Sequence, residues 1–183
     1  MNVEAKVPWK KGALEEQYTY VLMDQRPEPK ASLPWAQASL PRNLAFQYDS
    51  NNQVKTVVSR EYIPQGTCFG PLVGKICTGL KMSRSMDPKH FWKVFSSEGE
   101  LHHILAVNDP DCCNWMCYVN SAEAHSNQNL MAIQYNLEIY FYTVTPILDG
   151  EELLVWDARD ISKHIPSLQP GNLISQPECS VDG

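Results

Sequence analysis

The stretch GEELLVWD at residues 150–157 decides the fold of this 183-residue chain. Four consecutive apolar residues, Leu153 to Trp156, are typical of a buried strand, and Pro146 and Gly150 mark a turn before it. The stretch ends at Asp157, whose short carboxylate is ionised at neutral pH. The sequence therefore predicts a core strand that is followed directly by a charged residue.

Two pairs of strand patterns precede this stretch. Asn129–Tyr135 and Glu138–Val144 are the strongest, and Asn136-Leu137 predicts a tight turn between them. His90–Phe95 and Leu101–Val107 also have strand composition, and the short polar loop between them predicts a hairpin. Most of the core should therefore be β-sheet.

The earlier part of the chain adds strands and one short helical segment. Val54–Ser59 and Thr67–Gly74 are strand-like, with a turn at Ile63–Gly66, and together they predict a small antiparallel unit. Asn114–Asn120 has apolar spacings that fit one or two helical turns. The predicted fold class is mostly β with short helices.

Proline-bearing ends frame one predicted domain. Residues 1–37 are expected to be a flexible extension, in which the hydrophobic piece Tyr18–Met23 docks on the domain. Residues 38–163 form the domain, and residues 164–183 are polar, proline-containing and expected to be a flexible tail. A chain of this length fits one domain better than two.

Charge and hydropathy exclude several classes of protein. The formal net charge of −6 argues against nucleic-acid binding by this chain alone, which depends on Lys and Arg to neutralise phosphates. No apolar run approaches the roughly 20 residues that cross a bilayer, and residues 1–11 are too polar for a signal peptide. We expect a soluble intracellular protein.

In that compartment, free thiols are favoured over disulfides for all six cysteines, Cys68, Cys77, Cys112, Cys113, Cys117 and Cys179. Three of them with His102 and His103 raise a zinc alternative. Their spacing lacks the paired Cys-x-x-Cys or His-x-x-x-His units of familiar zinc sites, so no metal site is predicted.

Several segments together resemble the PR domain, a SET-related module at the amino end of zinc-finger transcription regulators, and most closely its Blimp type. The matching segments are Ala38–Leu44, Glu61–Thr67, Phe69–Leu72, Gly99–His103, Asn114–Met116, Tyr118–Asn120, Gln128–Leu130, Ile139–Tyr142 and Glu152–Trp156. The resemblance covers about residues 38 to 161.

The resemblance implies a SET/PR-like fold of small antiparallel sheets with a pseudoknot-like C-terminal region. It also implies nuclear location, a role in repressing or directing transcription, and DNA contact through zinc fingers elsewhere in the polypeptide. No such finger pattern lies in these 183 residues. The sequence is therefore expected to be an amino-terminal portion or a short form.

The resemblance also locates the site of methyl transfer from S-adenosylmethionine to lysine, and three of its parts are changed. The glycine turn that lets the backbone approach the cofactor is replaced by Val54-Lys55-Thr56. The Asn-His-Ser-Cys run is replaced by Asn120-Ser121-Ala122-Glu123, where only the asparagine matches. The terminal tyrosine is replaced by Asp157, so no catalytic residue is assigned there. Asn120 and Trp115 are the remnant cofactor-binding candidates.

Tyrosine and histidine side chains elsewhere in the sequence are candidates for the missing chemistry. Tyr140 and Tyr142 share one face of their strand and are candidate substitute hydroxyls, although a structural tyrosine pair is favoured. His102 and His103 lie in a strand, where alternation turns one inward and one outward, and a packed or solvated role is favoured. Cys117 stands where the Blimp type usually has arginine.

Three tryptophans, Trp92, Trp115 and Trp156, are expected in the core and around a pocket. An aromatic cluster that receives a peptide or a methylated lysine by cation–π contact is the alternative.

The function predicted from this pattern is that of a non-catalytic relative of the methyltransferases, acting as a protein-interaction module of a transcriptional repressor. Its expected partners are corepressors or chromatin-modifying enzymes, with histone tails as further candidates because basic peptides suit an acidic surface. No cofactor is expected. The alternative is a weak or specialised histone-lysine methyltransferase that uses S-adenosylmethionine.

Overall fold

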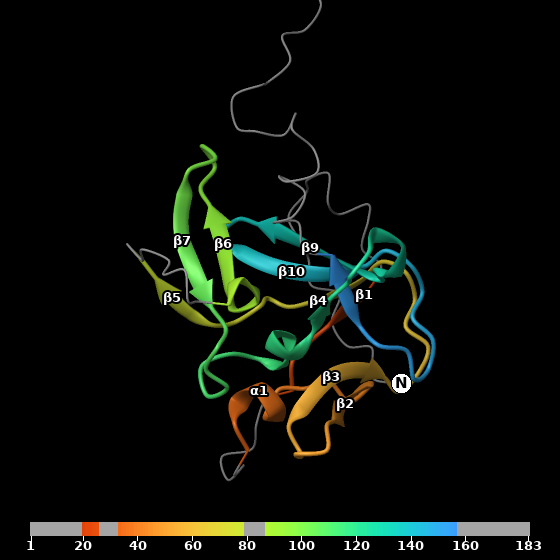
Figure 1. Ribbon diagram of the computed structural model, residues 1–183. Coiled ribbons are helices and arrows are strands. Elements are labelled where there is room, and N and C mark those ends of the chain that lie inside the picture. The colour runs from red at the N-terminus through yellow and green to blue at the C-terminus, as the bar shows by residue number, and fades with distance from the viewer. Residues whose placement is uncertain (1–19, 26–32, 79–86, 157–183) are drawn as a thin grey trace, which may run out of the picture.

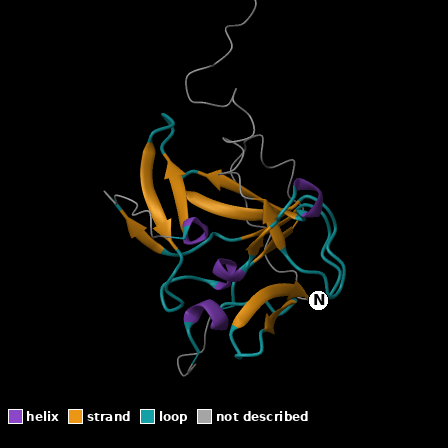
Figure 2. Ribbon diagram, in the orientation of Figure 1, coloured by secondary structure: helices purple, strands orange, loops and turns teal. Residues whose placement is uncertain are grey.

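Three β-sheets and a few single helical turns make up the described part of a computed structural model, which covers residues 20–25, 33–78 and 87–156 (Figure 2). The helical elements are α1 (Trp35–Ala38), η1 (Pro88–His90), η2 (Trp115–Tyr118) and η3 (His125–Asn127). The strands are β1 (Tyr20–Leu22), β2 (Leu44–Tyr48), β3 (Val54–Ser59), β4 (Thr67–Phe69), β5 (Lys75–Cys77), β6 (Phe91–Phe95), β7 (Leu101–Ala106), β8 (Asn120–Ser121), β9 (Leu130–Tyr135), β10 (Glu138–Thr143) and β11 (Leu154–Trp156). The predicted fold class, mostly β with short helices, is confirmed. None of the helices in these ranges has the length and hydropathy to span a membrane.

The largest sheet has six strands in the order β1-β4-β10-β9-β11-β8 (Figure 1). Its centre is the antiparallel pair β9 and β10, and the turn between them places Asn136 at a φ of 53°. Asparagine tolerates this left-handed conformation better than most residues. The strand patterns at residues 129–135, 138–144 and 153–156 thus predicted the centre of the fold to within a residue at each end.

A hairpin of β2 and β3 forms a separate two-stranded sheet, which corrects one predicted pairing. We predicted that Val54–Ser59 pairs with the next strand, but β3 pairs back on β2. The carboxylate of Asp49 explains the closure, because it accepts bonds from the amides of Asn51 (2.8 Å) and Gln53 (3.0 Å) in the turn. Beyond β3, Ile63 bridges to Ile147 and the chain passes into the largest sheet.

Strand β4 is shorter than predicted, since it ends at Phe69 rather than at Gly74. Gly70 has a φ of 130°, outside the strand region, and Pro71 has no amide hydrogen for a strand ladder. The chain resumes strand structure at β5, in a third sheet ordered β5-β7-β6. The predicted hairpin at residues 90–107 is the β6–β7 pair of this sheet.

The core includes Phe69 and Phe141 from the six-stranded sheet and Trp115 from η2, which are at most 1% exposed. Phe69 and Trp115 meet edge to face with ring centroids 5.4 Å apart. The indole nitrogen of Trp115 donates to Asp24 at 2.9 Å, and Asn114 donates to the same carboxylate at 2.9 Å. Burial is the larger influence on Asp24 and raises its pKa.

These two bonds attach the chain beside β1, inside the segment 1–37 that was predicted to be an extension. Strand β1 pairs in parallel with β4, so residues 20–22 belong to the sheet. This strand overlaps the hydrophobic piece that was expected to dock, whereas residues 1–19 and 164–183 lie outside the described residues.

Strand β11 lies between β8 and β9 and runs parallel to both, which gives the C-terminal region its pseudoknot-like path. The side chain of Asn129, 3% exposed, holds the strand in place. Its amide donates to the carbonyl of Glu152 at 2.7 Å, and its oxygen accepts from the amide of Leu154 at 2.8 Å. The backbone amide of Asn129 also donates to the carbonyl of Leu154 at 3.1 Å.

Replacing Asn129 by alanine should therefore weaken the whole domain. The change removes both side-chain bonds and leaves buried backbone groups unpaired, so we expect a loss of about 3 kcal/mol in unfolding free energy by urea titration. Asn127→Ala, an exposed site nearby, should cost less than about 0.5 kcal/mol. Equal losses for the two variants would contradict the role given to Asn129.

Candidate functional site

A cavity of about 780 Å³ lies where η2 meets β3, β6, β8 and β11. Trp92, Met116 and Leu154 supply apolar wall, and the backbone of η2 brings Cys117 and Tyr118 to the same space. η2 and β8 are consecutive in the chain, whereas β3, β6 and β11 come from distant parts of it. The cavity therefore depends on the tertiary fold, in which β11 lies beside β8.

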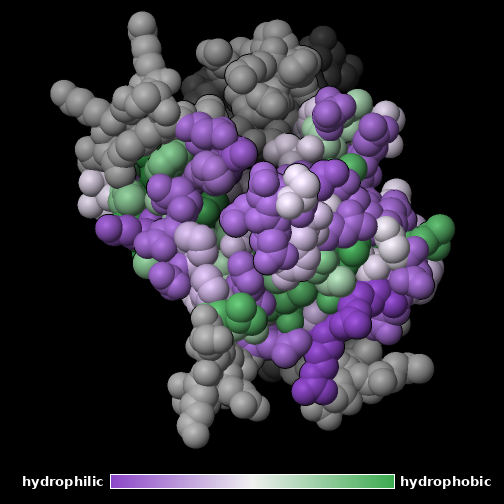
Figure 3. Space-filling view, turned by 60° about the horizontal axis from the view of Figure 1, so that its bottom comes forward, coloured by the Kyte–Doolittle hydropathy of each residue, from purple (hydrophilic) through white to green (hydrophobic). Residues whose placement is uncertain are grey.

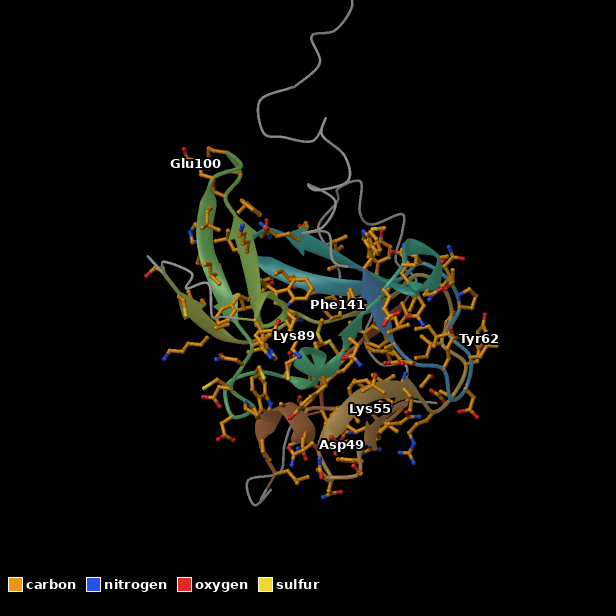
Figure 4. The ribbon with its side chains drawn as sticks, viewed as in Figure 1. Asp49, Lys55, Tyr62, Lys89, Glu100 and Phe141 are labelled. Carbon is orange, nitrogen blue, oxygen red and sulfur yellow. The ribbon has the colours of Figure 1, made fainter. Side chains whose placement is uncertain are left out.

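Charged side chains reach the cavity from two sides. Figure 4 labels Lys55 on β3 and Lys89 next to β6, with η2 between them in the view. The ammonium group of Lys89 lies 3.3 Å from a carboxylate oxygen of Asp87. The pKa of His90 is lowered by burial and, to a smaller extent, by the charge of Lys89, so this imidazole is neutral near pH 7.

Glu152 ties three strands together at the base of the cavity. Its Oε1 atom accepts hydrogen bonds from the hydroxyl of Thr56 on β3 and from the amide of Asn120 on β8, the latter at 3.1 Å. Asn120 also donates to the carbonyl of Lys55 at 3.2 Å. The amide of Asn120 is thus already engaged by groups of the protein itself.

The structure brings some of the predicted site residues together. Asn120, Val54 and Lys55 all line the cavity, and Thr56 lies behind it, 2% exposed. The segments that replace the glycine turn and the Asn-His-Ser-Cys run therefore meet at one place. Trp115, the other remnant candidate, is fully buried in the core and is not among the lining residues of this cavity.

Tyr140 and Tyr142 lie on the six-stranded sheet rather than in the cavity wall. The hydroxyl of Tyr140 donates to Glu138 at 2.7 Å, and that of Tyr142 donates to the sulfur of Met131 at 2.9 Å. Burial raises the pKa of both, and the Glu138 carboxylate adds to the rise at Tyr140. Both phenols therefore stay protonated near neutral pH.

Across the sheet, Tyr142, Met131 and Trp156 form one row, because Met131 pairs with Tyr142 on one side and with Trp156 on the other. Directly opposed residues share a face of the sheet. Asp157 follows Trp156 but lies outside the described residues, so its predicted role as the degraded catalytic position stays a prediction.

Cys113 is buried, and Cys117 is half-buried and lines the cavity. Hydrogen bonding from the Cys117 thiol lowers the pKa of Cys113, because it stabilises a thiolate. The hydrogen bond between the two thiols is the largest cause of the raised pKa of Cys117, and burial is the second. The two sulfurs therefore hold one proton firmly and release the other more easily.

His102 and His103 lie as the strand pattern predicted, since His103 is buried at 6% exposure and His102 is exposed. Their Nδ1 atoms are nevertheless only 2.8 Å apart. The register of β6 and β7 shifts between Val94 and Phe95, which interrupts strict alternation at this point. Burial, and then the neighbouring His102, lower the pKa of His103. Within the described ranges, no three His, Cys, Asp or Glu side chains converge as a metal site would require.

Sequence reasoning missed Lys89, His90 and Glu152 as cavity residues. Lys89 ends a polar stretch that is typical of a loop, His90 was expected to begin a strand, and no local signal places η1 beside β6. Glu152 was recognised within the closing stretch but given no role. An acidic residue just before a buried strand was the available signal, because such a carboxylate needs hydrogen-bond donors.

Comparison with known proteins places this geometry in a family. A family model for the PR domain of PR domain zinc finger protein 2 matches residues 43–167. The chain belongs to the PR domain family. This confirms the resemblance to the PR domain that was seen in the sequence.

Among related proteins, human PR domain zinc finger protein 4 is 33% identical over 132 residues, which cover 71% of this chain and 16% of the relative. Mouse PR domain zinc finger protein 14 is 30% identical over 128 residues, covering 69% of this chain and 22% of the relative. The PR domain thus spans less than a quarter of those two relatives. The Caenorhabditis elegans protein named histone-lysine N-methyltransferase set-17 is 27% identical over 82% of this chain and 53% of its own length.

A solved structure supports the same assignment. The methyltransferase domain of human PR domain-containing protein 2 matches with a TM-score of 0.55 and 29% identity, over 72% of this chain and 88% of that chain. The PR domain is thus related to SET methyltransferase domains in both sequence and fold.

Substitution of Glu152 tests whether its hydrogen bonds stabilise the strands around the cavity. Glu152→Ala removes the acceptor shared by Thr56 and Asn120, so we expect the unfolding free energy to fall by about 1–2 kcal/mol. Glu123→Ala changes an exposed carboxylate at the same cavity and should cost less than about 0.5 kcal/mol. Chemical denaturation of both variants checks this, and indistinguishable midpoints would argue against a structural role for Glu152.

Proposed function

We propose that this PR domain acts as a non-catalytic protein-interaction module of a transcriptional regulator. The observation that carries the proposal is the chemistry of the cavity wall, where Lys55 and the already engaged amide of Asn120 occupy the positions that would serve a cofactor. The charge of the wall does not decide against a sulfonium cofactor, because Glu123 and Glu152 line the same cavity as Lys55 and Lys89.

Two further features support the proposal against cofactor binding. Val54 and Lys55 introduce side chains where glycine would let the backbone approach a ligand closely. Asn120 would have to give up its bonds to Lys55 and Glu152 before it served a cofactor. The volume of the cavity does not exclude a ligand of that size, so the proposal rests on these side chains of the wall.

The surface is suited to contacts with basic proteins. The chain carries a formal charge of −6, and polar residues cover most of the face drawn in Figure 3, interrupted by small apolar areas. A negative surface favours encounter with basic peptides, while small apolar areas supply the buried contact that holds a complex. Corepressors, chromatin enzymes and histone tails are the proposed partners, and the nucleus is the proposed location.

Recruitment to a promoter tests the interaction role directly. Residues 1–183 fused to an unrelated DNA-binding domain should lower expression of a reporter that carries the matching sites. The variant Trp115→Ala, which empties the core, should lose this effect because it disrupts the folded surface. Unchanged reporter expression with the folded wild-type fusion would count against the proposal.

The second candidate function is a weak histone-lysine methyltransferase. The size of the cavity and the similarity to set-17 favour it. Incubation with labelled S-adenosylmethionine and core histones separates the two candidates, and our proposal predicts no incorporation above background. Incorporation by wild type that Asn120→Ala abolishes would instead establish the enzyme.

A further inference from the structure

Residues 20–25 lie along one edge of β4 in the way that a bound peptide adds a strand to a sheet. Within the described ranges, strand β1 pairs in parallel with β4 and with no other strand. The backbone amide of Gln25 then donates to the carbonyl of Ser39 at 2.9 Å. Main-chain pairing at a sheet edge is a common mode of peptide recognition. The segment is therefore attached to the domain like a peptide ligand that is part of the same chain.

Two side chains anchor this segment. Leu22 is partly buried and packs against the main core. The two carboxylate oxygens of Asp24 accept hydrogen bonds from the indole of Trp115 and the amide of Asn114, each at 2.9 Å. Met23, between the two anchors, is 54% exposed. Burial raises the pKa of Asp24, so lost hydration offsets part of what its hydrogen bonds contribute.

The receiving surface is held in place without the segment. On its other edge β4 pairs with β10. The side chain of Asn114, which is fully buried, accepts from the amide of Val73 at 3.0 Å and donates to the carbonyl of Pro71 at 2.9 Å. The backbone amide of Trp115 donates to the hydroxyl of Ser39 at 2.9 Å. A site whose groups are already positioned loses little conformational freedom when a ligand binds.

We propose that the edge of β4, together with Asn114 and Trp115, is a peptide-docking groove that residues 20–25 occupy and that a segment of a partner protein occupies in their place. The matching partner segment is extended and carries an apolar side chain followed two residues later by a carboxylate, as Leu22 and Asp24 do. The inference rests on the proposed interaction function for its biological role, whereas the binding itself is measured without a partner protein or a reporter.

The partner segment has to displace a competitor that belongs to the same chain. A tethered segment has a high effective concentration, so a free peptide competes poorly until the tethered segment is weakened. Displacement also requires that residues 20–25 open while the rest of the domain stays folded. Pairing with a single strand at the end of the sheet is typical of a segment that opens locally.

Peptide binding to an opened chain tests the groove. The full chain with Leu22→Ala and Asp24→Ala keeps the receiving surface but loses both anchors of its own segment. A fluorescent peptide with the sequence of residues 18–27 should bind this double variant about tenfold more tightly than it binds wild type, by fluorescence anisotropy. The same peptide with both alanine changes should bind the double variant about tenfold more weakly than the intact peptide does. Met23→Ala, at the exposed position between the anchors, should match wild type.

Native-state hydrogen exchange of the wild-type chain is a second measurement, which does not depend on how the double variant folds. The amides of residues 21–25 should exchange at least about tenfold faster than those of β9 and β10, because the segment opens separately. Equal protection of these regions would overturn the proposal.

Two results with a double variant that near-ultraviolet circular dichroism shows to be folded would also overturn it. One is equal binding of the intact and the alanine-substituted peptides. The other is no uptake of peptide, and a dimer of the chain in that case would point to strand exchange between two copies instead of a partner protein. Neither result bears on reporter repression, so failure of the groove is distinguishable from failure of the proposed function.

Discussion

The structure depends on the hydrogen bonds by which Asn129 holds strand β11 between β8 and β9. The side-chain amide of the buried Asn129 satisfies the carbonyl of Glu152 and the amide of Leu154, at 2.7 and 2.8 Å, so the last described strand is fixed at its amino end. Because β11 is parallel to both neighbours, no short turn joins it to either of them. Side-chain hydrogen bonds, rather than a hairpin turn, therefore fix the position of β11.

The same insertion contributes Leu154 to the wall of the cavity. Glu152, two residues before β11, lies where β3, β8 and η2 meet and accepts hydrogen bonds from Thr56 and Asn120 there. These bonds hold strands together and need no cofactor. These contacts hold the PR domain fold together around a cavity that Val54, Lys55 and Cys117 line.

Sequence patterns predicted the strands and turns that are formed by residues close together in the chain. Alternation and turn residues gave β9, β10 and the β6–β7 hairpin nearly to the residue, and they gave the helical turn at η2. The partner of β3 was predicted wrongly, because pairing depends on the Asp49 turn and on where Ile63 leads the chain. The path of β11 was expected only through the family resemblance, since no short-range signal encodes it.

Of the candidate site, the sequence placed Asn120 and the Val54-Lys55-Thr56 segment at one location, and the cavity unites them. Lys89, His90 and the contact between Cys113 and Cys117 depend on tertiary packing and have no pattern of their own.

Calorimetric titration of the whole chain with S-adenosylmethionine tests the central claim most directly. The account predicts no saturable heat and no rise in melting temperature, because a ligand that binds the native state must stabilise it. Saturable heat that disappears in Asn120→Ala would contradict it.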